Sequence, residues 1–374
     1  MNTRTRRLLL VGTVILILAV FLAYQSLKSV APVNEPLRIG AILPLTGNLA
    51  FIGEGIRNGI EMGKDEFNAA GGVRGQAIEI LYEDSKGSAA DGLSATQKLI
   101  DFDHVRFVIV NLTTVCLAVR PVLDQKSVLP FFLSTHPAVL NGSPNGFRIF
   151  ISGVQESTLL SHYADSHRYK TFTVLNVNDA YGKGTAQHLK SLLEKLGVVN
   201  SIEEYDLSSA DFRVIATKVK ESSPDALVVI GYGREYPLLF RQLGEQGWSG
   251  PILGNLSFAN LAGQSLQGPL ASQISYTAPG YFSAVTRLSS SQNFIDRYKR
   301  RYGKAPDFNA AYGYDNVRLL AQALSAVGES DTLRIRKFLL AVRGYEGAIG
   351  RVDMTPNGDS ETDMQVIDGI DGSK

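Results

Sequence analysis

The feature that most constrains the fold is a repeated alternation of short apolar runs with longer segments of helical periodicity. Residues 38–43 form a mostly apolar run that predicts a buried strand. Ile56, Ile60 and Phe67 then recur at helical spacing until Gly71-Gly72 ends the helix. Apolar strands separated by amphipathic helices predict a parallel sheet covered on both faces. The same alternation predicts further strands at 77–82, 105–110 and 129–133, and helices at 93–100 and 115–125.

The alternation then starts again, which predicts a second α/β half. A chain of 374 residues is long enough for two domains. The pattern therefore predicts an α/β protein of two similar halves, followed by more helices and a hairpin. In this second part we expect strands at 172–177, 198–205, 226–230 and 252–253, helices at 189–196, 211–221, 236–246, 294–301, 310–327 and 332–342, and a hairpin-like segment at 347–359.

The N-terminus has the features of an export signal. Arg4, Arg6 and Arg7 precede an uninterrupted apolar run at residues 8–23, which predicts an N-terminal apolar helix. No cysteine follows the run, so attachment of a lipid there is excluded, and the only small-residue cleavage site ends at Ala31 before a proline. Residues 1–31 are therefore expected to be either a cleaved signal peptide or an uncleaved membrane anchor, and both place the protein outside the cytoplasm.

Composition and motifs exclude several classes of function. A net charge of +1 and the absence of a basic stripe argue against a nucleic-acid partner. The five histidines show no metal-ligand spacing, Gly231-Tyr232-Gly233 lacks the third glycine of a dinucleotide-binding turn, and no nucleophile elbow is present. A single cysteine, Cys116, permits no intrachain disulfide. We therefore expect no enzyme activity, no cofactor and no metal.

A set of glycine-rich and polar segments occurs in a fixed order along residues 37–370, namely residues 39–47, Gly53, Asn58-Gly59, 68–75, 178–184, 347–352 and 357–359. Together they resemble the branched-chain amino-acid (Leu/Ile/Val-type) family of periplasmic solute-binding proteins of ABC transporters. This resemblance implies a type I periplasmic-binding-protein fold, in which two Rossmann-like lobes with parallel central sheets are joined by crossovers. It implies one lobe from residues 37–155 and 280–345 and a second from 156–279 and 346–374.

The resemblance also implies ligand-binding loops, and two of them follow strands of the first half. Thr113 and Thr114 stand where relatives hold the ligand's carboxylate, and hydroxyl groups beside the free amides of a helix N-terminus suit an anion. The alternative is that one of these threonines only caps the helix. Ser134 and Thr135 occupy the second loop, where a backbone carbonyl and a hydroxyl would accept hydrogen bonds from the ligand. His136, next to them, departs from the family pattern.

The other predicted ligand contacts are mostly aromatic. Tyr181 is expected to close over the ligand from the second lobe, and Tyr232 follows a strand end in the same way. Phe51 or Ile52 is expected to face the ligand's side chain. Relatives carry at the remaining position an acid that pairs with the ligand's ammonium group, but this chain has Leu256 there.

Leu256 leaves the recognition of an ammonium group open, because enclosing such a cation without a counter-charge costs several kcal/mol. One explanation is that another acid, such as Glu235 or Asp179, reaches the cleft. The others are that Leu256 is not the true counterpart of the family's acid, or that the ligand is not a zwitterion. An amide, a urea-like compound or a carboxylic acid is the alternative to an amino acid.

The resemblance implies the solute-binding component of an ABC importer, which closes two lobes around a small molecule and presents it to permease subunits. A second hypothesis is a membrane-tethered sensor that signals through a partner protein, motivated by the apolar run at residues 8–23. No output domain accompanies it in this sequence, so such a sensor would need a separate partner chain.

Overall fold

The computed structural model describes residues 35–261, 270–282, 287–328 and 331–369. The expected N-terminal helix at residues 8–23 lies outside the described residues. None of the helices among the described residues has the length and apolar character needed to cross a membrane.

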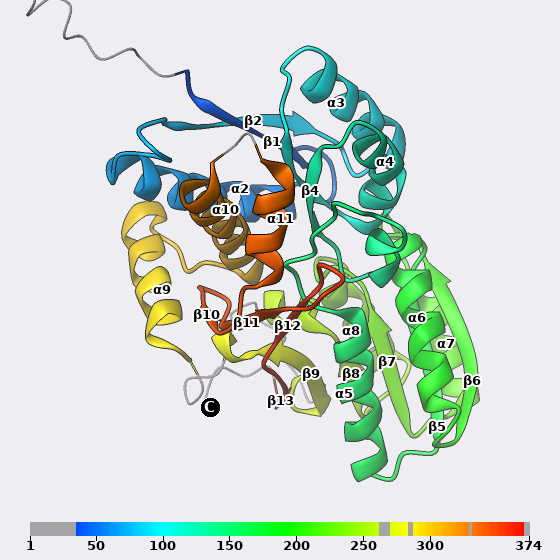
Figure 1. Ribbon diagram of the computed structural model, residues 1–374. Coiled ribbons are helices and arrows are strands. Elements are labelled where there is room, and N and C mark those ends of the chain that lie inside the picture. Colours follow the sequence, from blue (N-terminus) through cyan, green and yellow to red (C-terminus); the bar gives the residue numbers. More distant parts are fainter. Residues whose placement is uncertain (1–34, 262–269, 283–286, 329–330, 370–374) are drawn as a thin grey trace, which may run out of the picture.

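The first sheet has four parallel strands in the order β2-β1-β3-β4. Its central strand β3 is buried at every position, and helices cover both of its faces (Figure 1). The helix α10 packs along α2, and a Cβ atom at Gly59 would lie 1.9 Å from the carbonyl oxygen of Ala310, so only glycine permits this approach. The elements are β1 (Leu37–Leu43), α2 (Ala50–Ala69), β2 (Ile78–Asp84), α3 (Ala89–Asp101), β3 (Phe107–Asn111), α4 (Thr113–Gln125) and β4 (Leu129–Leu133).

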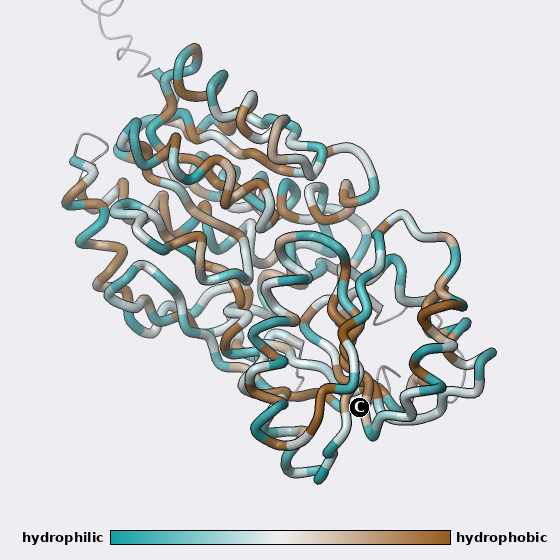
Figure 2. Tube along the Cα trace, turned by 90° about the vertical axis from the view of Figure 1, so that its right-hand side faces the viewer, coloured by the Kyte–Doolittle hydropathy of each residue, from teal (hydrophilic) through white to brown (hydrophobic). Residues whose placement is uncertain are grey.

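The second sheet has six strands in the order β13-β9-β8-β7-β5-β6. The strands from β9 to β6 are parallel, and β13 joins β9 as an antiparallel edge strand. The apolar strands lie inside this half, under the more polar helices (Figure 2). The elements are α5 (Gly153–Ser166), β5 (Thr171–Val177), α6 (Ala180–Leu193), β6 (Val198–Tyr205), α7 (Arg213–Ser222), β7 (Ala226–Ile230), α8 (Tyr236–Glu245), β8 (Ile252–Gly254), β9 (Ile274–Pro279) and β13 (Met364–Asp368).

The chain crosses between the two sheets more than once. It leaves the first sheet after β4 and enters the second at α5, returns after β9 to helices that cover the first sheet, and ends in a small antiparallel sheet that leads into β13 (Figure 1). The remaining elements are α9 (Ser289–Tyr302), α10 (Phe308–Val327), α11 (Thr332–Leu340), β10 (Tyr345–Glu346), β11 (Arg351–Met354) and β12 (Ser360–Thr362), and the short 3-10 helices η1 (Pro137–Leu140), η2 (Leu256–Leu261), η3 (Ala271–Gln273) and η4 (Gly280–Phe282).

A buried arginine ties two of these crossings together. Arg148 lies between β4 and α5 with no exposed surface, and its guanidinium donates to both carboxylate oxygens of Asp359, at 2.8 and 2.5 Å. It also donates to the carbonyl oxygen of Thr135 at 2.5 Å and to the hydroxyl of Ser152 at 3.2 Å. Because Asp359 lies in the turn between β11 and β12, the first and last crossings share one ion pair.

Three predicted strands agree with the structure to the residue, and two of them, β4 and β7, are buried at every position. The predicted strands 129–133, 198–205 and 226–230 have the same bounds in the structure. The helix α5 and the strands β9 and β13 were not predicted, and the sheets are not wholly parallel, because β13 runs antiparallel to β9.

Candidate ligand-binding site

A cavity with an empty volume of about 520 Å³ lies at the carboxyl ends of strands from both sheets. Loops after β3, β4, β7 and β8 form its walls together with the first turns of several helices. This is the position at which open α/β sheets bind ligands. The described residues that line it are Ile52, Asn111, Leu112, Thr113, Leu133, Ser134, Thr135, Phe150, Ile151, Glu156, Tyr181, Gly231, Tyr232, Asn255, Leu256, Ser257, Phe308 and Asn309.

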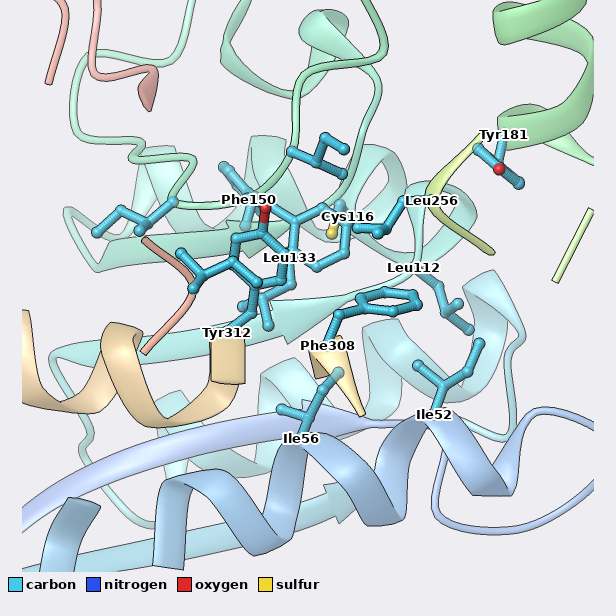
Figure 3. Packing of buried hydrophobic residues seen from close by; sticks show 14 of the residues in the cluster. Ile52, Ile56, Leu112, Cys116, Leu133, Phe150, Tyr181, Leu256, Phe308 and Tyr312 are labelled. Carbon is cyan, nitrogen blue, oxygen red and sulfur yellow. The ribbon is translucent and has the colours of Figure 1, made fainter. Parts of the chain in front are cut away.

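One part of the wall is apolar. Figure 3 shows Ile52 of α2, Phe308 of α10 and Leu112 pointing into the same region, with Tyr181 approaching from a separate element. Leu256, which begins η2, is 2% exposed and adds its side chain to this wall. The site can therefore enclose an aliphatic or aromatic group.

A pair of hydroxyl groups stands at the start of α4. Thr113 is the first residue of this helix, and its Oγ1 lies 2.9 Å from Oγ of Ser134. The first amides of an α-helix have no partner within the helix, so they add N–H donors to the two hydroxyls. Leu112, just before the helix, has φ of 72°, a strained value for a residue with a side chain. Thr113 and Ser134 thus line the cavity together, whereas Thr114 is not among its lining residues.

Two tyrosines of the second half face this hydroxyl pair across the cavity. Tyr181 lies in the first turn of α6, is 7% exposed, and has its ring centroid 5.2 Å from that of Tyr232. Its hydroxyl accepts a hydrogen bond from the side-chain amide of Asn255. The hydroxyl of Tyr232 donates to Asp179 at 2.6 Å, and Asp179 caps α6 by accepting from Gly182 N. Each tyrosine is therefore held by a residue of another segment, Tyr181 by Asn255 after β8 and Tyr232 by Asp179 before α6.

The structure places the two acids expected as substitutes for the family's acid outside the lining. Asp179 is used as a helix cap and as the acceptor for Tyr232. Glu235 accepts the backbone N–H of Tyr232 at 2.7 Å and lies 3.1 Å from the hydroxyl of Tyr205. Neither residue lines the cavity. Leu256 does line it, as expected, with an aliphatic side chain.

A carboxyl group nevertheless lines the cavity, and it is that of Glu156 in the first turn of α5. Its Oε1 accepts the backbone N–H of Leu256 at 2.8 Å and the hydroxyl of Thr277 at 3.0 Å. Glu156 is 1% exposed, and burial raises its pKa to about 7. Among the described lining residues there is no other carboxyl group and no basic side chain.

The raised pKa predicts how the stability of the ligand-free protein depends on pH. Between the ordinary value of 4.5 and about 7, folded Glu156 holds a proton that the unfolded chain has released. The contribution of Glu156 to the free energy of unfolding is therefore largest at low pH. As pH rises from below 4.5 to above about 7, this contribution falls by on the order of 3 kcal/mol. Urea unfolding of the wild type and of Glu156→Gln from pH 4.5 to 8 measures this change in the free energy of unfolding.

The comparison of the two proteins isolates this contribution, because burial also raises the pKa of Asp315, to about 6, and both proteins retain Asp315. The wild type should lose stability relative to Glu156→Gln as pH rises. A constant difference between the two proteins over this range would contradict the prediction.

Of the two residues expected to face the ligand's side chain, Phe51 and Ile52, only Ile52 lines the cavity. The ring of Phe51 lies 4.9 Å from the guanidinium carbon of Arg234, whereas Ile52 lines the cavity. Cys116 is buried, and burial raises the pKa of its thiol well above the ordinary value. The described residues hold no cluster of three or more His, Cys, Asp or Glu side chains that could bind a metal ion.

Several lining residues were not identified from the sequence. Glu156 and Ile151 lie in a segment for which neither a strand nor a helix was predicted. Phe308 begins α10 two residues before the predicted start, and Asp307 caps that helix by accepting the N–H of Ala310 at 2.8 Å. The Asp307–Phe308 pair carries the usual signal of a helix start and could have indicated Phe308. Glu156 has no comparable local signal.

Comparisons with known proteins identify the family of this chain. The family model described as "Periplasmic binding protein" matches residues 36–372. The Leu/Ile/Val-binding protein homolog 3 of Brucella melitensis is 27% identical over 329 residues, covering 86% of this chain and 88% of that protein.

Two solved structures have the same fold. The branched-chain amino acid transporter substrate binding protein LivJ of Streptococcus pneumoniae, in complex with isoleucine, has a TM-score of 0.79 at 25% identity and covers 89% of this chain and 96% of its own. A solute binding protein of an ABC transporter from Rhodopseudomonas palustris, in complex with 3,4-dihydroxy benzoic acid, has a TM-score of 0.79 at 22% identity, with coverages of 89% and 93%. The resemblance inferred from the sequence motifs is confirmed, and the chain belongs to the periplasmic binding protein family.

Proposed function

We propose that this protein binds an amino acid or a related small molecule between its two lobes and delivers it to the permease subunits of an ABC importer. The observation that carries the proposal is a single cavity whose walls come from both sheets. In this proposal residues 37–155 and 280–345 form one lobe and residues 156–279 and 346–374 the other. A ligand enclosed by both lobes favours their closed arrangement, because it contacts both only when they meet.

In this proposal different lining residues bind different parts of the ligand. The hydroxyls of Thr113 and Ser134, with the free amides of α4, would bind a carboxylate. Tyr181 and Tyr232 would cover the ligand from the second lobe. The apolar wall around Leu256 would take the rest of the molecule. The isoleucine and 3,4-dihydroxy benzoic acid bound by the two similar proteins each combine a carboxylate with a less polar part.

The proposed location is the periplasm or the outer face of the cytoplasmic membrane. Membership of the periplasmic binding protein family supports a position outside the cytoplasm. Residues 1–31 would direct export through their basic start and apolar run. If this segment stays attached, residues 8–23 would anchor the protein in the membrane.

The proposal predicts that specific small molecules stabilise the full-length protein. A thermal-shift screen would cover amino acids, aliphatic and aromatic carboxylic acids, and amides, because a ligand that binds only the folded state raises the melting temperature. Replacing Thr113 with valine keeps its shape but removes a hydroxyl, and should weaken carboxylate-bearing ligands roughly 10-fold. Thr114→Val is the matched control, since Thr114 is not a lining residue. A wild type that responds to no small molecule would contradict the proposed function.

A further inference from the structure

Three oxygen atoms of the cavity-lining residues have no hydrogen-bond partner within the described structure. They are Oδ1 of Asn111, Oγ1 of Thr135 and Oε2 of Glu156, and all three are buried. Buried polar atoms in folded proteins almost always have partners, and one without a partner costs free energy. Their shared position in the wall indicates that they are partners for a bound molecule.

Each of the three atoms can accept a hydrogen bond. The side-chain amide of Asn111 donates to the carbonyl oxygen of Leu133 at 2.8 Å, which fixes the orientation of the amide and leaves Oδ1 as the free atom. Oε1 of Glu156 already accepts two hydrogen bonds, so Oε2 is the oxygen left to the ligand. The hydroxyl of Thr135 accepts as well. A ligand that satisfies this group of atoms must bring N–H or O–H donors.

The backbone brings these acceptors to one end of the cavity. Asn111 pairs with Leu133 in the parallel ladder of β3 and β4, two residues before Thr135. The carbonyl oxygen of Thr135 accepts the N–H of Gly153, the first residue of α5, at 2.9 Å. Glu156 lies in the same first turn of α5. Ser134, half of the hydroxyl pair at the start of α4, is the neighbour of Thr135, so the donor and acceptor ends of the site adjoin.

The charge of Glu156 narrows the class of ligand. The positive group that interacts with Glu156 is Arg148, whose guanidinium is already held by Asp359 and by the carbonyl oxygen of Thr135. The other titratable groups that interact with Glu156 are the hydroxyls of Tyr181 and Tyr312, both neutral at physiological pH because burial raises their pKa. An ionised Glu156 therefore needs a cation from the ligand.

We infer that Glu156 is the counter-ion of a protonated amino group, and that Asn111 and Thr135 accept further hydrogen bonds from that group. An alkylammonium has three N–H donors, which matches the three free acceptors. Together with the hydroxyl pair of Thr113 and Ser134, this assigns the site to α-amino acids with an apolar side chain. The inference rests on the proposed function. Leu256 no longer argues against a zwitterion, because its backbone N–H holds the acid that replaces the missing one.

The inference is tested with pairs of ligands that differ only in the amino group. Isothermal titration calorimetry of the full-length protein would use leucine, valine and phenylalanine, each paired with the carboxylic acid that lacks the amine. At least one amino acid should bind, and its deaminated partner should bind roughly 30-fold to 1,000-fold more weakly. Glu156→Gln keeps the shape of the side chain and should weaken the amino acid by a similar factor while leaving the deaminated acid nearly unchanged.

Two further measurements keep the outcome interpretable. Glu235→Gln is the matched control, because Glu235 is also buried with a free Oε2 but does not line the cavity, and it should leave the affinity within roughly threefold of the wild type. Titrations at pH 6 in buffers of different ionisation enthalpy should detect proton release when the wild type binds the amino acid, because the ammonium group forces Glu156 to ionise. Glu156→Gln should release none.

Failure of the inference and failure of the proposed function give different results. If deaminated acids bind the wild type as tightly as amino acids, or if Glu156→Gln binds amino acids as the wild type does, the inference is wrong while the binding function stands. If neither class binds, and no amide or other acid in the thermal-shift screen does, the proposed function itself is wrong. A fold defect in Glu156→Gln would appear as lost affinity for the deaminated acid too.

Discussion

Replacing Arg148 with methionine is expected to lower the free energy of unfolding by about 3–5 kcal/mol. Arg148 is fully buried, and its guanidinium satisfies both oxygens of Asp359 and the carbonyl oxygen of Thr135. Methionine has a similar length but no charge and no donors. The variant would leave a carboxylate that is 19% exposed without its partner, and an unpaired buried charge costs far more than the ion pair contributes.

Urea or thermal unfolding of the ligand-free protein measures this effect. Arg38→Met is the control, because Arg38 pairs with Glu79 on the surface, with exposed fractions of 52% and 44%, and should change the stability by less than about 1 kcal/mol. Adding Asp359→Asn to Arg148→Met should restore part of the loss, since it removes the unpaired charge. Equal effects of the two arginine substitutions would show that the pair between the crossings contributes little.

Replacing Gly184 with leucine is expected to weaken ligand binding strongly without lowering the stability of the ligand-free protein. Gly184 lies in α6, and a Cβ atom there would lie 2.3 Å from the imidazole ring of His136, which follows β4 of the first sheet. The ring is held by the backbone N–H of Ala138, which donates to its Nδ1 at 3.1 Å. A leucine would therefore hold the lobes apart. At about 1–3 kcal/mol for overpacking, the affinity should fall roughly 5-fold to 150-fold.

This prediction is checked by calorimetry with the compound that stabilises the wild type most in the thermal-shift screen. Gly244→Leu is the matched control, because Gly244 also lies in a helix, but a Cβ atom there would lie 3.7 Å from its closest neighbour, Cδ1 of Leu270. The double variant His136→Ala with Gly184→Leu should recover most of the affinity, since it removes the ring that the leucine meets. A Gly184→Leu protein with wild-type affinity would mean that this contact is not part of the ligand-bound arrangement.

Most of the architecture could be predicted from local sequence. The strands β4 and β7 were predicted to the residue, because a strand buried on both faces is apolar along its whole length. The edge strand β6 was also predicted to the residue, although only its last residue, Tyr205, is buried. The helix α5 was missed because Glu156, Ser157 and Ser161 lie on its buried face, which leaves no clear periodic pattern of apolar residues. The edge strand β13 depends on pairing with β9, which lies far away in the sequence.

The sequence by itself determined the two α/β halves, the loops at the strand ends and, through the resemblance, the hydroxyls expected at the carboxylate end of the site. Only the tertiary structure decided which acid lines the cavity. Glu156 and Leu256 are separated by 100 positions, yet the carboxylate of one accepts the backbone N–H of the other. The crossing after β4 places α5 beside β9 and β13, and the contact with β9 buries the carboxyl group in the wall. No local pattern records such a contact, because burial and pairing are properties of the folded chain.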